Sequence, residues 1–513
     1  MADEFKKETS LTARAFWLIF AKSLAFVFGF ALPLLLVRRL SQREFGLYKQ
    51  AFLVVGTASA MLPLSFVMSA FYFLPRERER RGAVVLNIML FNAVAGCVAL
   101  VVLLLRPGLL GAIFNSHALI PYAPQVGLLI FFWIVSYFLE IGSIANQDSR
   151  LSAAFIICAQ LTKTALLLTA AVVFSTVGAL LWAAIIQGAL QTIALVIYLR
   201  SRFGAFWRAF DGGVMRRQLA YALPLGFGAI LSVVIADMHN YIVSYRFGEE
   251  AFAVYAVGCF SLPLIGIIIE SIGTVMIARV SHLQAEGDRA GIIAVTAAAM
   301  RKLALVYFPL YALLFVVSRE FIAFLFTARY ASSWPIFVIN LTTLPFLILI
   351  ADPIIRAHAE HRYFLLKIRA VTIVLLFAAL WFASARFGLV GAITVMVFAS
   401  VADRLVEAFK AWSIVGVTWR HALLLKDVGK VALASAGAAA LAEVARLFMS
   451  GARPFFVLAL CGVVFGLTYV ALVLLFGVPT TEERGMVRGK MSGALRLVWW
   501  RRATDPLVSG PEA

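Results

Sequence analysis

Residues 15–50 read AFWLIFAKSLAFVFGFALPLLLVRRLSQREFGLYKQ, an apolar run followed by a short charged connector. A helix that crosses the hydrocarbon of a bilayer needs about 20 apolar residues, and the run from Ala15 to Val37 has this length. It is too long for the apolar core of a cleaved secretory signal. The stretch therefore predicts a first membrane span, with the connector on the far side of the membrane.

The rest of the 513 residues have the same character. Hydrophobic residues make up 63% of the chain and charged residues 14%, with a mean hydropathy of +0.95, whereas soluble proteins have about 45–50% apolar and about 25% charged residues. The composition predicts an all-α polytopic membrane protein. All four cysteines lie in apolar runs and none forms a CxxC pair, so we expect neither a metal site nor a disulfide framework, and no cofactor.

Fourteen apolar runs of spanning length are separated by charged or turn residues. The predicted spans are 15–37, 48–74, 83–105, 124–145, 153–174, 177–199, 219–243, 252–277, 295–317, 333–351, 364–384, 389–415, 429–448 and 455–477.

The charges predict the orientation. Most of the 45 Lys and Arg residues fall in connectors on the same side as the N-terminus. The positive-inside rule then places both termini in the cytoplasm, with a basic tail over 478–513 against anionic headgroups. This topology accounts for the net charge of +19 without a nucleic-acid partner. Every connector is short, so no external catalytic domain is expected.

One sequence pattern occurs twice, six spans apart. Arg, Phe and Tyr recur with the same spacing at Arg39, Phe45 and Tyr48 and at Arg246, Phe252 and Tyr255. An even number of intervening spans gives both copies the same orientation, which is how parallel repeats of transporters are related. The repeat predicts an N-terminal lobe over 1–200, a C-terminal lobe over 219–416 and two added helices over 427–477.

Three stretches resemble a known family. The segments LPLLLVRRLSQREFGLYKQ (32–50), IADMHNYIVSYRFGEEAFAVYAVGCFSLPL (235–264) and RFGLVGAITV (386–395) are similar to the polysaccharide transporter proteins, or oligosaccharide flippases, of the MOP exporter superfamily. The resemblance implies a V-shaped transporter with two six-helix lobes. It would move an undecaprenyl-diphosphate-linked oligosaccharide from the cytoplasmic to the periplasmic leaflet of a bacterial inner membrane.

The resemblance has further implications. Transport would proceed by alternating access and be driven by an ion or proton gradient. The glycan would pass through a central polar cavity while the lipid tail stays in the bilayer. The sugar repeat would serve capsule, O-antigen or exopolysaccharide assembly, with polysaccharide polymerase or export proteins as candidate partners.

Two lysines inside spans are candidates for binding the diphosphate or glycan, because a cation in a span survives mainly when it is paired, hydrated or functional. Lys163 lies about ten residues into the fifth span, hence about 15 Å deep at 1.5 Å per residue. It is expected either to line a polar cavity with Gln160 or to pair with Glu140 of the fourth span. Lys22, nearer the start of the first span, either faces the cavity or reaches the interface.

Acidic residues are the candidates for coupling. Glu270 lies deep in the eighth span, where a lone carboxylate either exchanges a proton or packs in its neutral form. Asp237 and His239, near the outer end of the seventh span, either bind a cation or sugar hydroxyls together or cap the helix end. Glu140 is a further acidic candidate.

Other intramembrane charges have competing interpretations. Arg301, beside Lys302, either faces the cavity or marks the cytoplasmic boundary, in which case 287–299 lies along the membrane surface. A group of alternating sign in the twelfth span is expected to be structural, with opposite charges pairing at three- and four-residue spacing. This group consists of Asp403, Arg404, Glu407 and Lys410.

Three other functions compete with the flippase interpretation. A lipid-linked peptidoglycan precursor flippase usually carries more Arg in its first helix than the single Lys22 seen here. A small-solute exporter of the MATE type usually has twelve spans. A membrane glycosyltransferase or polymerase would need a larger external loop, and no Walker, HExxH or GxSxG motif occurs, so we expect no enzymatic activity.

Overall fold

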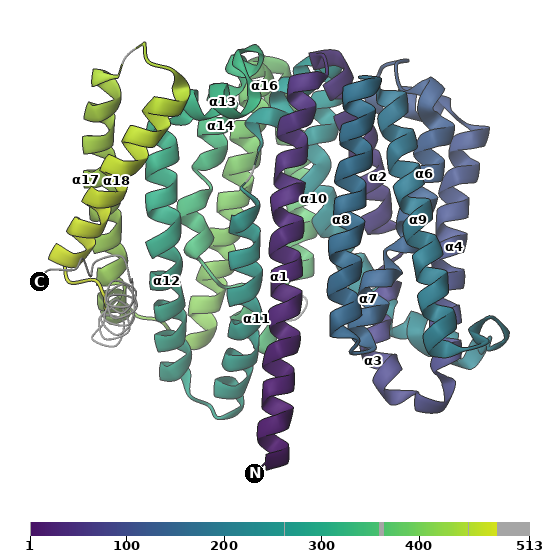
Figure 1. Ribbon diagram of the computed structural model, residues 1–513. Helices are drawn as coiled ribbons and strands as arrows, with labels where there is room; N and C mark the ends of the chain where they lie inside the picture. The colour runs from purple at the N-terminus through teal and green to yellow at the C-terminus, as the bar shows by residue number, and fades with distance from the viewer. Residues whose placement is uncertain (1, 261, 359–363, 450, 480–513) are drawn as a thin grey trace, which may run out of the picture.

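The computed structural model describes residues 2–260, 262–358, 364–449 and 451–479. Side chains are described from residue 21 onward, apart from Pro263, Leu264, Glu270 and Trp419. All regular elements in this part of the chain are helices, most of them upright and side by side (Figure 1). We call the end of the bundle that holds residue 2 the lower side, and the end that holds the turn at 40–41 the upper side, as drawn in Figure 1.

The N-terminal lobe consists of the first nine α-helices. Helix α1 is continuous from residue 2, so it extends below the predicted span, and it packs along α8. The bounds are α1 (Ala2–Arg39), α2 (Gln42–Met61), α3 (Ser69–Arg76), α4 (Arg81–Leu105), α5 (Gly108–Phe114), α6 (Ala123–Ser136), α7 (Phe138–Ala145), α8 (Ser149–Val173) and α9 (Val177–Phe203).

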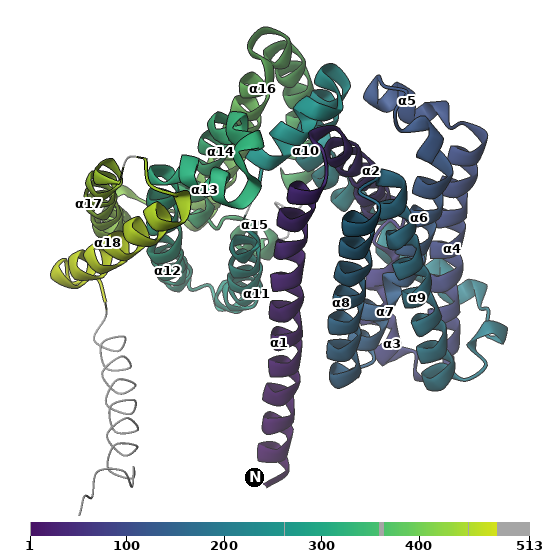
Figure 2. The same ribbon diagram turned by 45° about the horizontal axis from the view of Figure 1, so that its top comes forward.

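The C-terminal lobe and the two added helices follow. Helices α17 and α18 pack against each other and lie at the edge of the bundle, beyond α12 (Figures 1 and 2). The bounds are α10 (Gly212–Gly258), α11 (Pro263–Ala285), α12 (Arg289–Val316), α13 (Ser318–Phe326), α14 (Trp334–Leu341), α15 (Asp352–Ala357), α16 (Phe364–Val415), α17 (Lys426–Phe448) and α18 (Pro454–Leu475).

The spans match the sequence prediction once broken helices are considered. Twelve described helices are long and apolar enough to cross a membrane, and one bent pair makes thirteen. Helix α16 turns back at Gly388 and contains two of the predicted spans, which gives fourteen. Large apolar side chains are exposed on many of these helices, as expected of surfaces that face lipid; examples are Val94, Leu105, Phe382 and Phe398. The predicted basic tail lies outside the described residues beyond position 479.

Several predicted spans contain breaks that the apolar pattern does not reveal. The second span bends by 47° between α2 and the segment Phe66–Arg76, where Pro63 removes a backbone donor. The eighth span consists of the end of α10 and, after a break before Pro263, helix α11. The long helices α10 and α16 are broken at Gly248 (φ 76°, ψ −173°) and Gly388 (φ 63°, ψ −145°), each the last residue of an Arg-Phe-Gly triplet.

We expect Gly388→Ala to destabilise the fold by about 1–3 kcal/mol, because the backbone conformation at Gly388 is essentially restricted to glycine. The measurement is the thermal unfolding midpoint of the purified protein in detergent. Gly462→Ala in α18 is the matched control, since that glycine has helical geometry and no atom within 4 Å of an added Cβ. Equal midpoints for the two variants would contradict this account of the turn.

The two copies of the repeated pattern meet at the upper side. Gly46 in α2 lies so close to α10 that an added Cβ would be 2.0 Å from the Glu249 carbonyl oxygen. Nearby, the Gln50 amide donates to the Ser244 hydroxyl at 2.6 Å. The ring of Phe45 contacts that of Tyr330 with centroids 6.0 Å apart. The lobes are therefore joined at this side by close backbone approach and buried polar contacts.

Two further hydrogen bonds at the upper side involve a charged side chain. Arg38 of α1 donates to the Phe324 carbonyl oxygen at 2.7 Å. The Ser116 hydroxyl, after α5, donates to the carboxylate of Glu249. These contacts also link the N-terminal lobe to the C-terminal lobe, so a change that opened the upper side would break all of them.

At the lower side, the start of α10 is attached to the N-terminal lobe. Asp211 caps α10 by accepting from the Val214 backbone N–H, and it also pairs with Arg80 at 3.0 Å. The Val214 hydrogen bond and the nearby guanidinium hold the pKa of the Asp211 carboxyl below its usual value. Arg217 pairs with Glu77 at 2.6 Å, so the Arg-rich segment at 76–81 contacts the start of α10.

Candidate functional site: a polar cavity in the N-terminal lobe

A cavity of about 770 Å³ lies against the inner face of the N-terminal lobe. Its size is within the range of small-molecule and cofactor sites. Helices α1, α2, α6, α7, α8 and α9 supply most of its wall, and α10 closes one side with Ala229 and Val233. Its charged lining residues are Lys22, Lys163 and Glu140, which are three of the residues singled out from the sequence.

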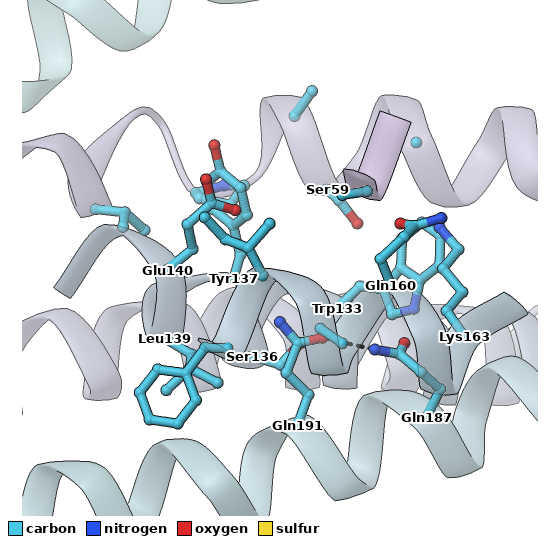
Figure 3. A pocket seen from close by; sticks show the side chains of 18 of the residues that line it. Ser59, Trp133, Ser136, Tyr137, Leu139, Glu140, Gln160, Lys163, Gln187 and Gln191 are labelled. Carbon is cyan, nitrogen blue, oxygen red and sulfur yellow. Dashed lines mark hydrogen bonds between the residues drawn. The ribbon is translucent and has the colours of Figure 1, made fainter. Parts of the chain in front are cut away.

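Lys163 lies at one end of this cavity, beside Trp133, Gln160 and Ser59 (Figure 3). The Lys163 ammonium is 4.5 Å from the centroid of the Trp133 ring, a cation–π contact. Among the described residues, no carboxylate lies within ion-pair distance of Lys163. The pairing with Glu140 that the sequence left open is therefore not formed.

Glu140 lies at the opposite end of the same cavity, beside Tyr137 (Figure 3). It belongs to α7, which begins after the chain bends at Tyr137, and it is two turns of helix below Trp133. At 1.5 Å per residue this corresponds to roughly 10 Å along the bundle. The cavity thus has Lys163 and Trp133 at its upper end and Glu140 in its lower part.

Three glutamines extend the polar lining. Gln187 is buried and donates to Gln191 one turn later on α9 at 2.7 Å. Gln160 Nε2 contacts Thr164 Oγ1 at 3.4 Å and approaches Gly29 of α1. Helix α9 is capped at its start, where the Thr176 side chain accepts a hydrogen bond from the Ala179 backbone N–H. Amide side chains both donate and accept, which suits sugar hydroxyls.

Two cavity donors have no partner in the structure. The Trp133 indole N–H and the Ser59 hydroxyl are buried and make no hydrogen bond with the described part of the chain. Buried polar groups are nearly always satisfied in native proteins, so such exceptions need an explanation. A polar ligand in the cavity would satisfy them.

Lys22 is exposed and lines the same cavity at a lower level than Lys163. Helices α1 and α8 run in the same direction (Figure 1), and Gly29 lies level with Gln160, whose Nε2 would be 3.5 Å from a Cβ added at Gly29. Lys22 is seven residues below Gly29, and Lys163 is three residues above Gln160. Their Cα atoms are therefore roughly 15 Å apart along the bundle at 1.5 Å per residue.

Arg301 does not line this cavity. It is half-buried in α12 and donates to the Val478 carbonyl oxygen at 3.2 Å. Helix α12 is continuous from Arg289, so the alternative in which 287–299 lies along the surface as a separate segment is wrong. Lys302, the next residue, is exposed. A role of Arg301 in substrate binding stays a prediction.

Of the acidic candidates, Asp237 and His239 are not brought together. Asp237 accepts from the Thr57 hydroxyl of α2 at 2.7 Å, whereas His239 is buried with Nδ1 2.8 Å from the Tyr255 hydroxyl. Neither caps a helix end, because α10 continues to Gly248. Their joint cation site is therefore not formed, and Asp237 instead bridges the two lobes. Among the described residues, no group of three or more metal-ligating side chains occurs.

Glu270 lies within α11, but its side chain is outside the described part of the structure. Its role in coupling stays a prediction.

The charged residues of the twelfth span do not form the expected ion pairs with one another. Among the described residues, no ion pair joins Asp403, Arg404, Glu407 and Lys410. Asp403 Oδ1 and Arg404 Nε are buried without a hydrogen-bond partner. Lys410 instead lies 5.7 Å from the centroid of the Phe364 ring. The predicted ladder is wrong because spacing along one helix does not ensure that long side chains turn toward each other.

Most of the cavity lining was not predicted from the sequence. No sequence pattern singled out Trp133, Ser59, Tyr137, Gln187 or Gln191. One signal was available: Gln187 and Gln191 are four residues apart in an otherwise apolar span, so they share a helix face. The inward direction of that face could not be read from the sequence.

Comparison with solved structures identifies the fold. The chain is similar to the lipid II flippase MurJ in an inward closed conformation, with TM-score 0.69 and 16% identity over 90% of this chain and 98% of that chain. It is also similar to an inward-facing multidrug resistance MATE transporter, with TM-score 0.59 and 13% identity over 78% and 96%. A mutant form of the MATE transporter VcmN of Vibrio cholerae matches with TM-score 0.56 and 13% identity over 80% and 98%.

The fold is that of MurJ and of the MATE transporters of the MOP superfamily. The chain belongs to the polysaccharide biosynthesis protein family, whose family model matches residues 16–335. No curated protein sequence matches it. The predicted class, an all-α polytopic protein with two lobes and two added helices, is confirmed, and so is the resemblance to the polysaccharide transporters.

Proposed function

We propose that this protein is a flippase that moves an undecaprenyl-diphosphate-linked oligosaccharide, a repeat unit of exopolysaccharide, capsule or O-antigen, across the bacterial inner membrane. In this proposal the lower side faces the cytoplasm, in agreement with the positive charge predicted there. The protein acts as a transporter without enzymatic activity, and ion or proton flow drives it. Polysaccharide polymerase or export proteins receive the product.

The observation that carries the proposal is the polar cavity between apolar outer surfaces. Lysine, amide and indole groups line the cavity, whereas large apolar side chains are exposed elsewhere on the helices. This arrangement suits an amphipathic substrate whose charged headgroup enters the bundle while its hydrocarbon tail stays in the bilayer. The polysaccharide biosynthesis family further supports a glycan headgroup.

The contacts between the lobes support alternating access. In this structure the lobes are joined at the upper side by Gly46, Gln50, Ser116 and Arg38 of the N-terminal lobe. In this proposal the cavity loads from the lower side. Transport requires the upper contacts to separate while the lower side closes.

A lipid-linked peptidoglycan precursor is the second candidate substrate, because the MurJ structure aligns with 90% of this chain and the MATE structures with less. A strain in which the gene is deleted distinguishes the two candidate substrates. Under the proposal it accumulates complete repeat units that an added sugar-specific enzyme cannot reach in spheroplasts, and peptidoglycan synthesis continues. Accumulation of peptidoglycan precursor would favour the second candidate. Unpolymerised repeat units at the outer leaflet would contradict flipping by this protein.

A further inference from the structure

We infer that the upper end of the cavity is a subsite for an acidic sugar, which Lys163 recognises through its carboxylate. The inference rests on the proposed function and deepens it by assigning the charge of the glycan. It starts from the separation of the two cavity lysines, roughly 15 Å along the bundle at the helical rise.

The diphosphate of a lipid-linked glycan is tied to the membrane tail. While the tail lies in the lower leaflet, the diphosphate stays near the headgroups and the glycan extends upward into the protein. Lys22, exposed in the lower part of the cavity, is placed to meet the diphosphate. Lys163 lies farther up, at the level that sugar residues reach. A second anionic group on the glycan accounts for a second, separate cation.

The surroundings of Lys163 have the composition of a sugar site. Its ammonium lies over the Trp133 ring without a carboxylate partner among the described residues. The Trp133 indole N–H and the Ser59 hydroxyl lack hydrogen-bond partners, and Gln160 and Gln187 are close by (Figure 3). A sugar carboxylate would bind the Lys163 ammonium in place of the Trp133 ring face. The hydroxyls of the sugar would accept hydrogen bonds from the Trp133 indole N–H and the Ser59 hydroxyl.

The acid in the cavity favours the same placement. Glu140 lies about two helical turns below Trp133, at the end of the cavity opposite Lys163 (Figure 3). An anionic sugar bound at the upper end is thus kept away from this carboxyl group.

The test uses two probes with the full-length protein in nanodiscs. One is a polyprenyl-diphosphate trisaccharide that carries a single uronic acid, and the other is its carboxyl-reduced, neutral counterpart. We expect the acidic probe to bind the unchanged protein at least about tenfold more tightly, because a charge-assisted hydrogen bond is gained. In Lys163→Gln this ratio falls to about one while the neutral probe keeps its affinity.

Lys22→Gln should weaken the binding of both probes by the same factor. Lys302 is an exposed intramembrane lysine outside the cavity, so Lys302→Gln is the matched control. Equal affinity of the unchanged protein for both probes, or equal weakening of both by Lys163→Gln, would overturn the acidic subsite and leave the flippase proposal standing. If neither probe binds or is flipped, the proposed function itself fails.

Discussion

A thiol cross-link between positions 116 and 249 is expected to stop transport completely, and its reduction to restore it. Ser116 belongs to the N-terminal lobe and Glu249 to the C-terminal lobe, and their side chains are hydrogen-bonded at the upper side. An outward-open state requires these positions to separate. A short covalent link prevents this and holds the protein with its cavity accessible only from the lower side.

The experiment uses Ser116→Cys and Glu249→Cys in a background without native thiols. The native cysteines to be replaced by alanine are Cys97, Cys158, Cys259 and Cys461. A short bifunctional thiol reagent with a reducible bridge forms the link, and flipping is measured before and after reduction. Each single-cysteine variant treated in the same way is the control. Undiminished flipping by the fully cross-linked protein would contradict opening at this side.

Lys163→Gln is expected to lower the transport rate by about 10- to 100-fold. A hydrogen bond to a charged group contributes about 1.5–3 kcal/mol, and each 1.4 kcal/mol corresponds to a factor of ten. Because no carboxylate among the described residues pairs with Lys163, the substitution strands no opposite charge. The thermal midpoint should therefore not fall.

A lower transport rate with an unchanged thermal midpoint distinguishes a substrate-binding lysine from a structural one. Loss of one partner of a buried ion pair typically destabilises a protein by about 3–5 kcal/mol. A steep drop in the midpoint of Lys163→Gln would thus indicate a structural role and contradict our interpretation. Lys163→Arg keeps the charge and should recover part of the transport rate. Lys302→Gln should leave both the midpoint and the rate unchanged.

The sequence predicted the architecture well because a membrane imposes one strong requirement. Each span must be apolar over about 20 residues, so the apolar runs locate helices even where the chain is broken. The breaks within these helices were harder to predict from the sequence. Gly248 and Gly388 end the same Arg-Phe-Gly triplet, and a comparison of the two triplets would have indicated two equivalent turns.

The candidate site was only partly predictable. Lys163, Lys22 and Glu140 stood out because a charge in a span is costly, and all three line one cavity. Which face of a helix points inward depends on contacts between distant segments, such as Gly29 with Gln160. For that reason Trp133 was not singled out, and the joint site of Asp237 and His239, one of two alternatives for this pair, is not formed, since residues two apart on a helix point to different sides.

The repeat had a consequence that the sequence did not predict. Two copies in parallel orientation suggest two similar lobes, but the structure also brings the copies together at the upper side, where Gly46 meets Glu249. A glycine is required there because any side chain would collide with the opposing backbone.

Flipping by the purified protein tests the central claim most directly. The full-length protein is reconstituted into liposomes that contain a labelled undecaprenyl-diphosphate-linked repeat unit, and an external sugar-specific enzyme measures how fast inner-leaflet glycan becomes accessible under an imposed ion or proton gradient. We predict rapid exposure of the inner pool with the unchanged protein and slow exposure with Lys163→Gln. Exposure at the rate of protein-free liposomes, by protein that retains its thermal midpoint, would contradict the account.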